Sequence, residues 1–191
     1  MNFLTQDEVL SVLRVARQES MRDWLLILLA YRHGLRATEV TSLKVSDIQN
    51  GALDIKRAKG SLRTIQPLDI FKGEPLLNEK VGISAWLKAG ARPTDAGDAL
   101  FPSAKGGSLR PDSFNKIFKH YAHKAGLGAD KDNPHILKHS CATHLIRVNV
   151  NLAVVQQRLG HASLSSTQKY VHLSDTEVAE KSANAMYEVF K

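Results

Sequence analysis

The sequence predicts a mainly α-helical fold of the α+β class, in which a small antiparallel β-sheet is inserted among the helices. Apolar residues recur at helical spacing over most of the 191-residue chain, a pattern typical of amphipathic helices packed around one core. Residues 45–68 depart from this spacing, and there Asn50-Gly51, the strongest short hairpin signal, separates strand-like runs. A chain of this length and apolar content can bury a sizeable core, so we expect a single domain over residues 1–191.

The expected helices carry recognisable start and stop signals. Thr5 and Glu8 have the spacing of a capping box ahead of the first helix. Residues 22–33 are apolar on most sides, as expected of a helix in the middle of a core, and Gly34 ends this helix. A second turn at residues 58–61 completes the small sheet. Further helices are expected at residues 69–89, 111–125, 134–147, 152–159 and 174–190.

Composition narrows the class of protein. The net charge of +7 and the pI of about 9.6 fit a polyanionic partner. The single cysteine, Cys141, rules out an internal disulfide framework and suits a reducing cytoplasm; its apolar surroundings indicate a core residue. The N-terminus shows no signal-peptide pattern, and the most apolar run, residues 24–30, is too short to span a bilayer. We therefore expect a cytoplasmic protein with no membrane partner.

Six chemically capable side chains stand at expected helix ends or turns. In chain order they are Arg36, Lys59, His135, Lys138, His161 and Tyr170. A tyrosine can be a covalent nucleophile when cations hold its phenolate and the electrophile, and a histidine near a helix N-terminus is well placed to meet an anion. Each residue alone has an ordinary alternative: Arg36 can form a surface ion pair with Glu39, Lys59 can belong to a solvated loop, and Tyr170 can be a half-buried aromatic residue.

A metal site is a further reading of one helix. His135 and His139 have the spacing of a helical metal-binding pair. Without a further ligand of the usual kind beside them, we expect no metal there.

The six residues lie in motifs which, together and in this order, resemble the catalytic domain of the tyrosine recombinases, the phage-integrase family. The motifs are His-Gly-Leu-Arg36-Ala-Thr-Glu39-Val, the hairpin Lys59-Gly60 leading to Pro67-Leu68, Pro134-His135-Ile-Leu-Lys138-His139-Ser-Cys-Ala-Thr-His144-Leu, and Leu159-Gly160-His161 followed by Thr167-Gln-Lys-Tyr170-Val-His172. The resemblance covers nearly the whole chain. It implies either a short stand-alone member, such as the invertases of fimbrial phase switches, or a fragment of a longer member.

The resemblance implies DNA strand exchange through a covalent intermediate. Tyr170 would attack a DNA phosphodiester and form a 3′-phosphotyrosyl link, with no ATP, metal or other cofactor. Arg36 and His161 would stabilise the charge that builds on the phosphate oxygens, Lys59 would be the general acid for the leaving 5′-oxygen, and His135 would assist proton transfer at the tyrosine. Lys138 would complete the catalytic set, and Glu39 would support it. The residues expected to contact DNA around the site are Lys56, Arg57, Arg63, His139 and Lys169.

The chain departs from the family pattern in two respects. Lys138 stands where an arginine is usual, and an ammonium group lacks the planar bidentate fork of a guanidinium. The N-terminal domain that clamps the other face of the DNA is expected to be absent. Two alternatives therefore stay open: a weakly active or inactive DNA-binding accessory or regulatory protein, and a topoisomerase-like enzyme that works without synapsis.

The expected partners follow from the same reading. They are double-stranded DNA, further copies of this chain in a tetrameric synapse, and an accessory DNA-bending protein. The apolar stripe of the last expected helix, residues 174–190, has little chain left to cover it, so we expect it to dock on another protomer.

Overall fold

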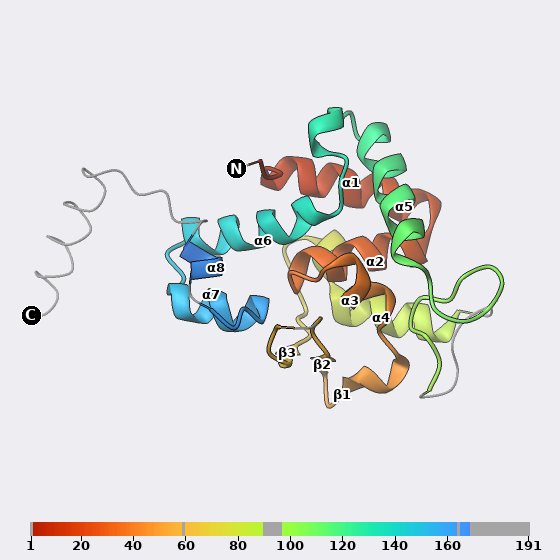
Figure 1. Cartoon of the computed structure of the whole chain (residues 1–191). Coiled ribbons are helices and arrows are strands. Elements are labelled where there is room, and N and C mark those ends of the chain that lie inside the picture. The colour runs from red at the N-terminus through yellow and green to blue at the C-terminus, as the bar shows by residue number, and fades with distance from the viewer. Residues whose placement is uncertain (1, 59, 90–96, 164, 169–191) are drawn as a thin grey trace, which may run out of the picture.

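The computed structural model describes residues 2–58, 60–89, 97–163 and 165–168. These residues contain eight α-helices and a three-stranded antiparallel sheet of order β1-β2-β3. Figure 1 shows how these elements are arranged. The helices are α1 (Gln6–Glu19), α2 (Met21–Arg32), α3 (Ala37–Thr41), α4 (Glu79–Lys88), α5 (Pro111–Lys124), α6 (His135–Arg147), α7 (Leu152–Leu159) and α8 (Ser165–Gln168). The strands are β1 (Ile48–Gln49), β2 (Ala52–Ile55) and β3 (Thr64–Pro67). Single 3-10 turns lie at η1 (Val45–Asp47), η2 (Pro75–Leu77) and η3 (Ala129–Lys131).

Helix α2 occupies the centre of the core, as its all-round apolar sequence predicts. Every residue from Trp24 to Ala30 is at most 3% exposed. Helices α1, α4 and α6 pack around α2. Because other helices pack tightly around α2, its C-terminal end at Arg32 has a well-defined position. The segment that follows α2 starts from that position.

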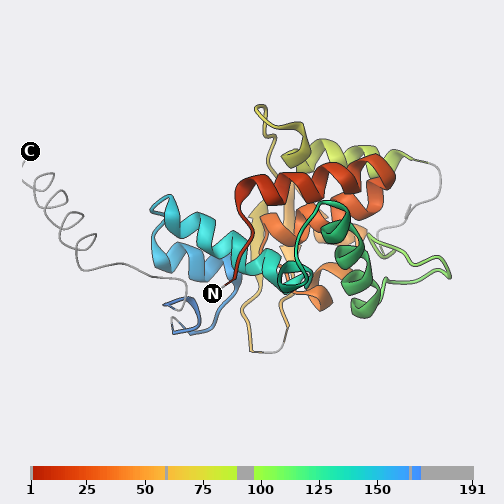
Figure 2. The same cartoon turned by 90° about the horizontal axis from the view of Figure 1, so that it is seen from above.

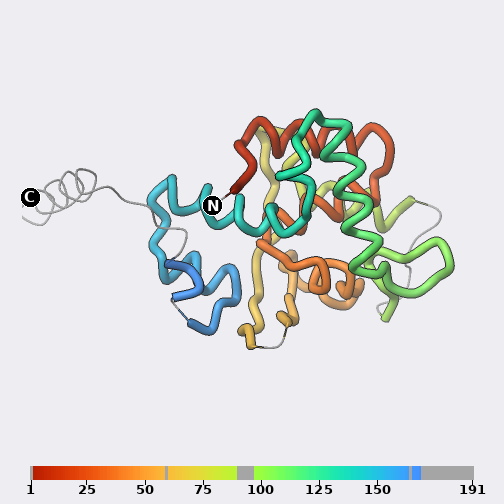
Figure 3. The backbone as a smooth tube through the Cα atoms, turned by 45° about the horizontal axis from the view of Figure 1, so that its top comes forward, coloured from red at the N-terminus to blue at the C-terminus, as the bar shows by residue number. Residues whose placement is uncertain are grey.

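The small sheet forms where the hairpin signal predicts it. Asn50 and Gly51 both have positive φ, 50° and 74°, as the tight turn between β1 and β2 requires. Strand β2 then pairs with β3 in the register Leu53 to Gln66 and Ile55 to Thr64. Figures 2 and 3 show the β2–β3 hairpin projecting from the helical body beside the α7–α8 segment.

The predicted helix over residues 69–89 is wrong in its first half. Residues 70–74 form no regular structure, and α4 begins only at Glu79, where the Asn78 side chain caps it by accepting from the Val81 amide. Pro75 disfavours a helical conformation at the residue before it and opens the short turn η2 instead. The other helices predicted up to residue 159 are confirmed to within one residue at each end, whereas the helix expected at residues 174–190 lies outside the described residues.

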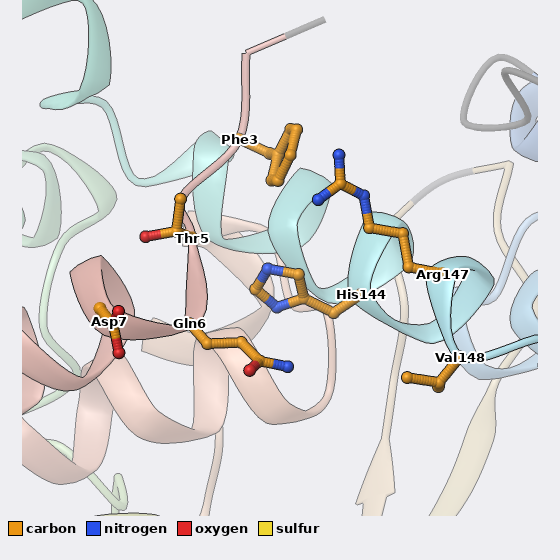
Figure 4. A pocket seen from close by; sticks show the side chains of 7 residues that line it. All are labelled: Phe3, Thr5, Gln6, Asp7, His144, Arg147 and Val148. Carbon is orange, nitrogen blue, oxygen red and sulfur yellow. The ribbon is translucent and has the colours of Figure 1, made fainter.

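The N-terminal segment is attached to α6 by stacked side chains. The Phe3 ring lies 4.5 Å from the Arg147 guanidinium carbon and meets the His144 ring edge-on at 6.0 Å. Figure 4 shows these groups around a pocket of about 360 Å³ between the start of α1 and the end of α6. The backbone amide of Leu4 also donates to Ser140 Oγ on α6. The N-terminal segment is thereby held on α6.

We predict that Gly82→Ala destabilises the protein, although alanine is normally the better helix former by about 1 kcal/mol. A Cβ at Gly82 would lie 2.6 Å from the Trp24 ring, so α4 must shift away from α2, at a cost of about 1–3 kcal/mol. Urea unfolding measures the change. Ser84→Ala, on the exposed side of the same helix, is the control and should be neutral or slightly stabilising. A Gly82→Ala variant more stable than the wild type would contradict this packing.

Candidate active site

Arg36 is presented by the junction between α2 and α3. Gly34 turns the chain at φ 56°, and a Cβ there would lie only 2.5 Å from the Leu159 side chain, so only glycine fits. Arg36 Nη1 then donates to Glu39 Oε1 at 2.9 Å and to Ser61 Oγ at 3.0 Å. The Arg36 side chain is 34% exposed, whereas that of Glu39 is 1% exposed. The pair is therefore no ordinary surface ion pair, because its carboxylate is inside the protein.

Glu39 is a buried acceptor shared by several donors. Besides the Arg36 side chain, it accepts from the backbone amides of Arg36 and Ala58 at 2.9 and 3.1 Å and from Arg57 Nη1 at 3.1 Å. Burial alone would raise the pKa of Glu39, but these amides and the charges of Arg57 and Lys138 lower it to about 2. Glu39 is therefore a carboxylate at neutral pH and holds Arg36 in one orientation.

The β2–β3 hairpin brings Arg36 and His161 together. Beyond the paired strands, Ser61 forms an antiparallel bridge with His161, and the Leu62 amide donates to Gly160 O at 2.9 Å. Ser61 thus touches both predicted phosphate-binding residues: its hydroxyl meets Arg36 and its backbone pairs with His161. Two residues separated by more than half the chain converge on one serine.

His161 is fixed by the turn that follows α7. Gly160 closes α7 in the left-handed conformation, at φ 67°, as predicted for a helix cap. His161 is 6% exposed, and its ring Nδ1 lies 2.9 Å from Thr167 Oγ1 on α8. Thr167 is itself fully buried, so the contact orients the imidazole from within the protein.

Helix α6 supplies the two remaining predicted catalytic residues that the structure describes. His135 stands in its first turn and is exposed, and its ring meets that of His139 edge-on with centroids 4.5 Å apart. Lys138, one turn along, is only 2% exposed, and its Nζ donates to Leu159 O at 3.0 Å. Lys138 therefore contacts the end of α7 two residues before His161.

The ammonium group of Lys138 is strongly perturbed. Burial lowers the pKa of Lys138 to about 7, repulsion from Arg57 and Arg36 acts in the same direction, and Glu39 opposes both. A lysine that titrates near neutral pH differs from an arginine, which keeps its charge throughout.

The prediction that Arg57 contacts DNA from the hairpin tip is contradicted by its burial. Its side chain is 0% exposed and bonds entirely to protein atoms. The other two predicted hairpin contacts are exposed: Lys56 lies 3.5 Å from Asp47 and Arg63 forms an ion pair with Asp54. Lys59, Lys169 and Tyr170 lie outside the described residues.

A family model described as the phage integrase family matches residues 2–177. The chain belongs to the phage integrase family. The resemblance inferred from the motifs is thereby confirmed, and so is the mainly α-helical fold with a small antiparallel sheet.

Named relatives in this family are similar over most of this chain. The tyrosine recombinase XerA of Pyrococcus furiosus is 35% identical over 182 residues, which cover 93% of this chain and 59% of the relative. The tyrosine recombinase XerD of Proteus mirabilis is 35% identical over 158 residues, covering 81% of this chain and 48% of the relative. Among solved structures, XerH bound to difH in a pre-cleavage complex has a TM-score of 0.75 at 26% identity, covering 95% of this chain and 54% of that one. This family member therefore spans between about half and three fifths of the length of these relatives.

Three contacts of this integrase-family site were not foreseen. Ser61 joins Arg36 to His161, Thr167 orients His161, and Gln66 donates to Arg158 O at 2.7 Å beneath the site. The motifs name Thr167 without a role and do not contain Ser61. The local sequence around Ser61, two residues after the predicted hairpin lysine, does not predict its role, because its partners are remote in sequence.

The described part of the chain contains neither a cluster of metal ligands nor a membrane-spanning helix. Within it, no group of three or more His, Cys, Asp or Glu side chains is placed to hold a metal ion. No helix there has both the length and the apolar character that crossing a bilayer demands.

We predict that Lys138→Met changes how the stability of this family member depends on pH. In the wild type the pKa of Lys138 is about 7 when folded and 10.5 ordinarily, so between these values the unfolded chain binds more protons and stability rises with pH. The variant lacks this rise. Its free energy of unfolding relative to the wild type should therefore fall between pH 7 and 10, by at most about 1.4 kcal/mol per pH unit.

Urea unfolding at pH 6.5, 8 and 9.5 measures this difference. Lys116→Met, on the exposed side of α5, is the matched control, and its effect should vary much less with pH. A difference between Lys138→Met and wild type that stays constant over this range would show that folding does not lower the pKa of Lys138.

Proposed function

We propose that this chain is the catalytic domain of a site-specific DNA recombinase that cleaves and rejoins DNA through a 3′-phosphotyrosyl intermediate. The observation that carries the proposal is the convergence on Ser61, where Arg36 from the α2–α3 junction meets the backbone of His161 from the end of α7. Membership of the phage integrase family and 35% identity to tyrosine recombinases support it.

In the proposed reaction Tyr170 Oη attacks the phosphorus while the bond to the 5′-oxygen breaks. His135 accepts the phenolic proton, and Lys59 protonates the departing 5′-oxygen. Arg36 and His161 act on the non-bridging oxygens, where negative charge increases in the transition state, and Lys138 adds its positive charge from behind. The phosphotyrosyl bond retains the energy of the phosphodiester, so the 5′-hydroxyl of the same or another strand can reverse the step without ATP.

The rigidity of the described donors supports this assignment. Arg36 is held by a buried carboxylate and His161 by a buried hydroxyl, so neither has to be ordered when substrate binds. Donors that are fixed before the reaction cost no reorganisation in the transition state, and this is the main source of electrostatic catalysis.

The proposal includes partners and location. Double-stranded DNA is the substrate, for which the exposed Lys56 and Arg63 and the half-buried His139 offer contacts beside the site, and Lys169 is a further candidate. Strand exchange needs two duplexes, so we propose a tetrameric synapse of this chain in which residues 174–190 dock on a neighbouring protomer, with an accessory DNA-bending protein. We also propose a cytoplasmic location.

One observation favours a second candidate, a DNA-binding regulatory protein with weak or no cleavage. Lys138 replaces the usual arginine and directs its amine to a protein carbonyl at 3.0 Å. A single buried donor cannot reproduce a bidentate guanidinium on phosphate. The topoisomerase-like alternative shares the cleavage chemistry and differs in lacking synapsis.

The proposed function predicts a covalent protein–DNA adduct. Nicked duplexes with a bridging phosphorothiolate, tiled across the DNA that flanks the gene, should trap the protein on DNA because the sulfur leaving group cannot re-attack efficiently. Tyr170→Phe should abolish the adduct, since the phenolic oxygen is the nucleophile, while DNA binding stays within about twofold. Denaturing gel electrophoresis reads out the adduct.

Two controls separate the alternatives. Tyr187→Phe removes a tyrosine outside the motifs and should leave the adduct yield unchanged. DNA binding with no adduct on any duplex would favour the regulatory protein, and cleavage that never yields exchanged strands between two duplexes would favour the topoisomerase-like enzyme.

A further inference from the structure

We propose that Arg57 is a positioning residue that sets Arg36 and His161 relative to one another, and that it makes no contact with DNA. The inference rests on the proposed function for its catalytic consequence. Its structural basis is a buried guanidinium group whose N–H groups all donate to protein acceptors. These hydrogen bonds join four segments around the site.

Every N–H of the Arg57 guanidinium has an acceptor. Nε donates to Thr64 Oγ1 at 3.3 Å, Nη1 to Gly34 O and to Glu39 Oε2 at 3.1 Å each, and Nη2 to His33 O at 3.0 Å and to Arg158 O. A guanidinium has five donors, and here five acceptors face them. With a side-chain exposure of 0%, none of this hydrogen-bonding capacity is directed at solvent.

One half of the network fixes Arg36. Arg57 and Arg36 donate to the two different oxygens of Glu39, Oε2 and Oε1. The carboxylate is therefore clamped from both sides, and its orientation decides where the Arg36 guanidinium lies. Arg57 also bonds to the carbonyls of His33 and Gly34, the segment that delivers Arg36 from the end of α2.

The other half fixes His161. Arg57 bonds to the carbonyl of Arg158, in the last turn of α7. Its own side chain lies directly beneath Gly160: a Cβ there would come within 2.8 Å of Arg57 Cγ and 3.0 Å of Nε. The turn that carries His161 is thus held by a hydrogen bond on one side and by close packing on the other.

The chemistry of this position requires arginine. The acceptors are three main-chain carbonyls, one hydroxyl and one carboxylate, which come from four segments of the chain. Carbonyls at the C-terminal ends of two helices carry partial negative charge, so a cation between them is favourable. A lysine has three donors on a single atom and cannot span this set, so two or more buried acceptors would lose their partner.

The test compares Arg57→Lys with Arg22→Lys, a half-buried arginine at the other end of α2 that pairs with Asp23 at 2.8 Å. Each full chain is measured in two ways. The first is the rate of adduct formation on the phosphorothiolate duplexes, beside the affinity for the same DNA. The second, without DNA, is the set of amide resonances of Arg36, Gly160 and His161 in nitrogen–proton correlation spectra.

Arg57→Lys should lower the adduct rate about a hundredfold, as misplacement of reacting groups by about 1 Å does, with DNA affinity little changed. The three amide resonances should shift, while those of α5 do not. Arg22→Lys should alter neither measurement. If Arg57→Lys fails to fold, the near-isosteric Thr64→Val, which removes one acceptor of the network, should still shift the resonances and lower the rate by about tenfold at most.

An unchanged adduct rate and unchanged resonances of Gly160 and His161 in a folded Arg57→Lys or Thr64→Val variant would overturn the inference. A loss of DNA affinity in step with the adduct rate would also overturn it, because Arg57 would then be a DNA contact. If the wild type forms no adduct, the proposed function fails, and the resonances alone still decide whether Arg57 positions these residues.

Discussion

The site depends on how three successive carbonyl groups at the end of α7 are satisfied. The carbonyls of residues 158–160 accept from Arg57 and Gln66, from Lys138, and from the Leu62 amide respectively. The last carbonyls of a helix have no partner within the helix and carry the negative end of its dipole. Here the sheet, α6 and the hairpin each provide donors. Satisfying one helix end therefore joins every segment that carries a described catalytic candidate.

This arrangement concentrates positive charge. Glu39 is the carboxylate among Arg36, Arg57 and Lys138, so the cluster holds three cationic side chains against one anion. Burial lowers the pKa of Lys138 to about 7, and repulsion from Arg57 and Arg36 acts in the same direction. A phosphate group at the site would supply the missing negative charge. Features that lower stability are expected at a functional site. Here the feature is an excess of positive charge, which suits a negatively charged phosphodiester.

Much of the fold could be predicted from the sequence, because the position of helices and turns depends on short stretches of residues. The apolar run of α2 allowed only a central position, and Asn50-Gly51 and Gly160 met backbone conformations that few other residues adopt. Arg57 was misassigned because a cluster of basic residues at a hairpin tip was interpreted by charge alone. The alternation of side chains along a strand indicates that Arg57 is buried. Leu53 and Ile55 are buried, and Arg57 follows on the same face.

In strand β3, the alternation of apolar and polar residues does not predict which side chains are buried. Strand β3 buries Thr64 and Gln66 and leaves Ile65 68% exposed, which inverts the usual pattern. The inversion follows from Arg57, because Thr64 accepts from its Nε, and from α7, because Gln66 donates to the carbonyl of Arg158. These partners are up to 92 residues away in the sequence, so no local window contains the reason.

Lys138 and Arg57 both donate to carbonyls at the end of α7, but Arg57 meets more acceptors than Lys138 does. This difference explains why a lysine can occupy position 138. Within the residues that the structure describes, Lys138 donates to one protein acceptor, Leu159 O at 3.0 Å, and a single ammonium donor is enough for it. Arg57 has five acceptors, one for each N–H group of its guanidinium, and lysine has too few donors to meet them. The replacement at position 138 therefore leaves the support of His161 intact. In the proposed mechanism it leaves bidentate recognition of the phosphate to Arg36, the described arginine of the cluster whose side chain reaches the surface.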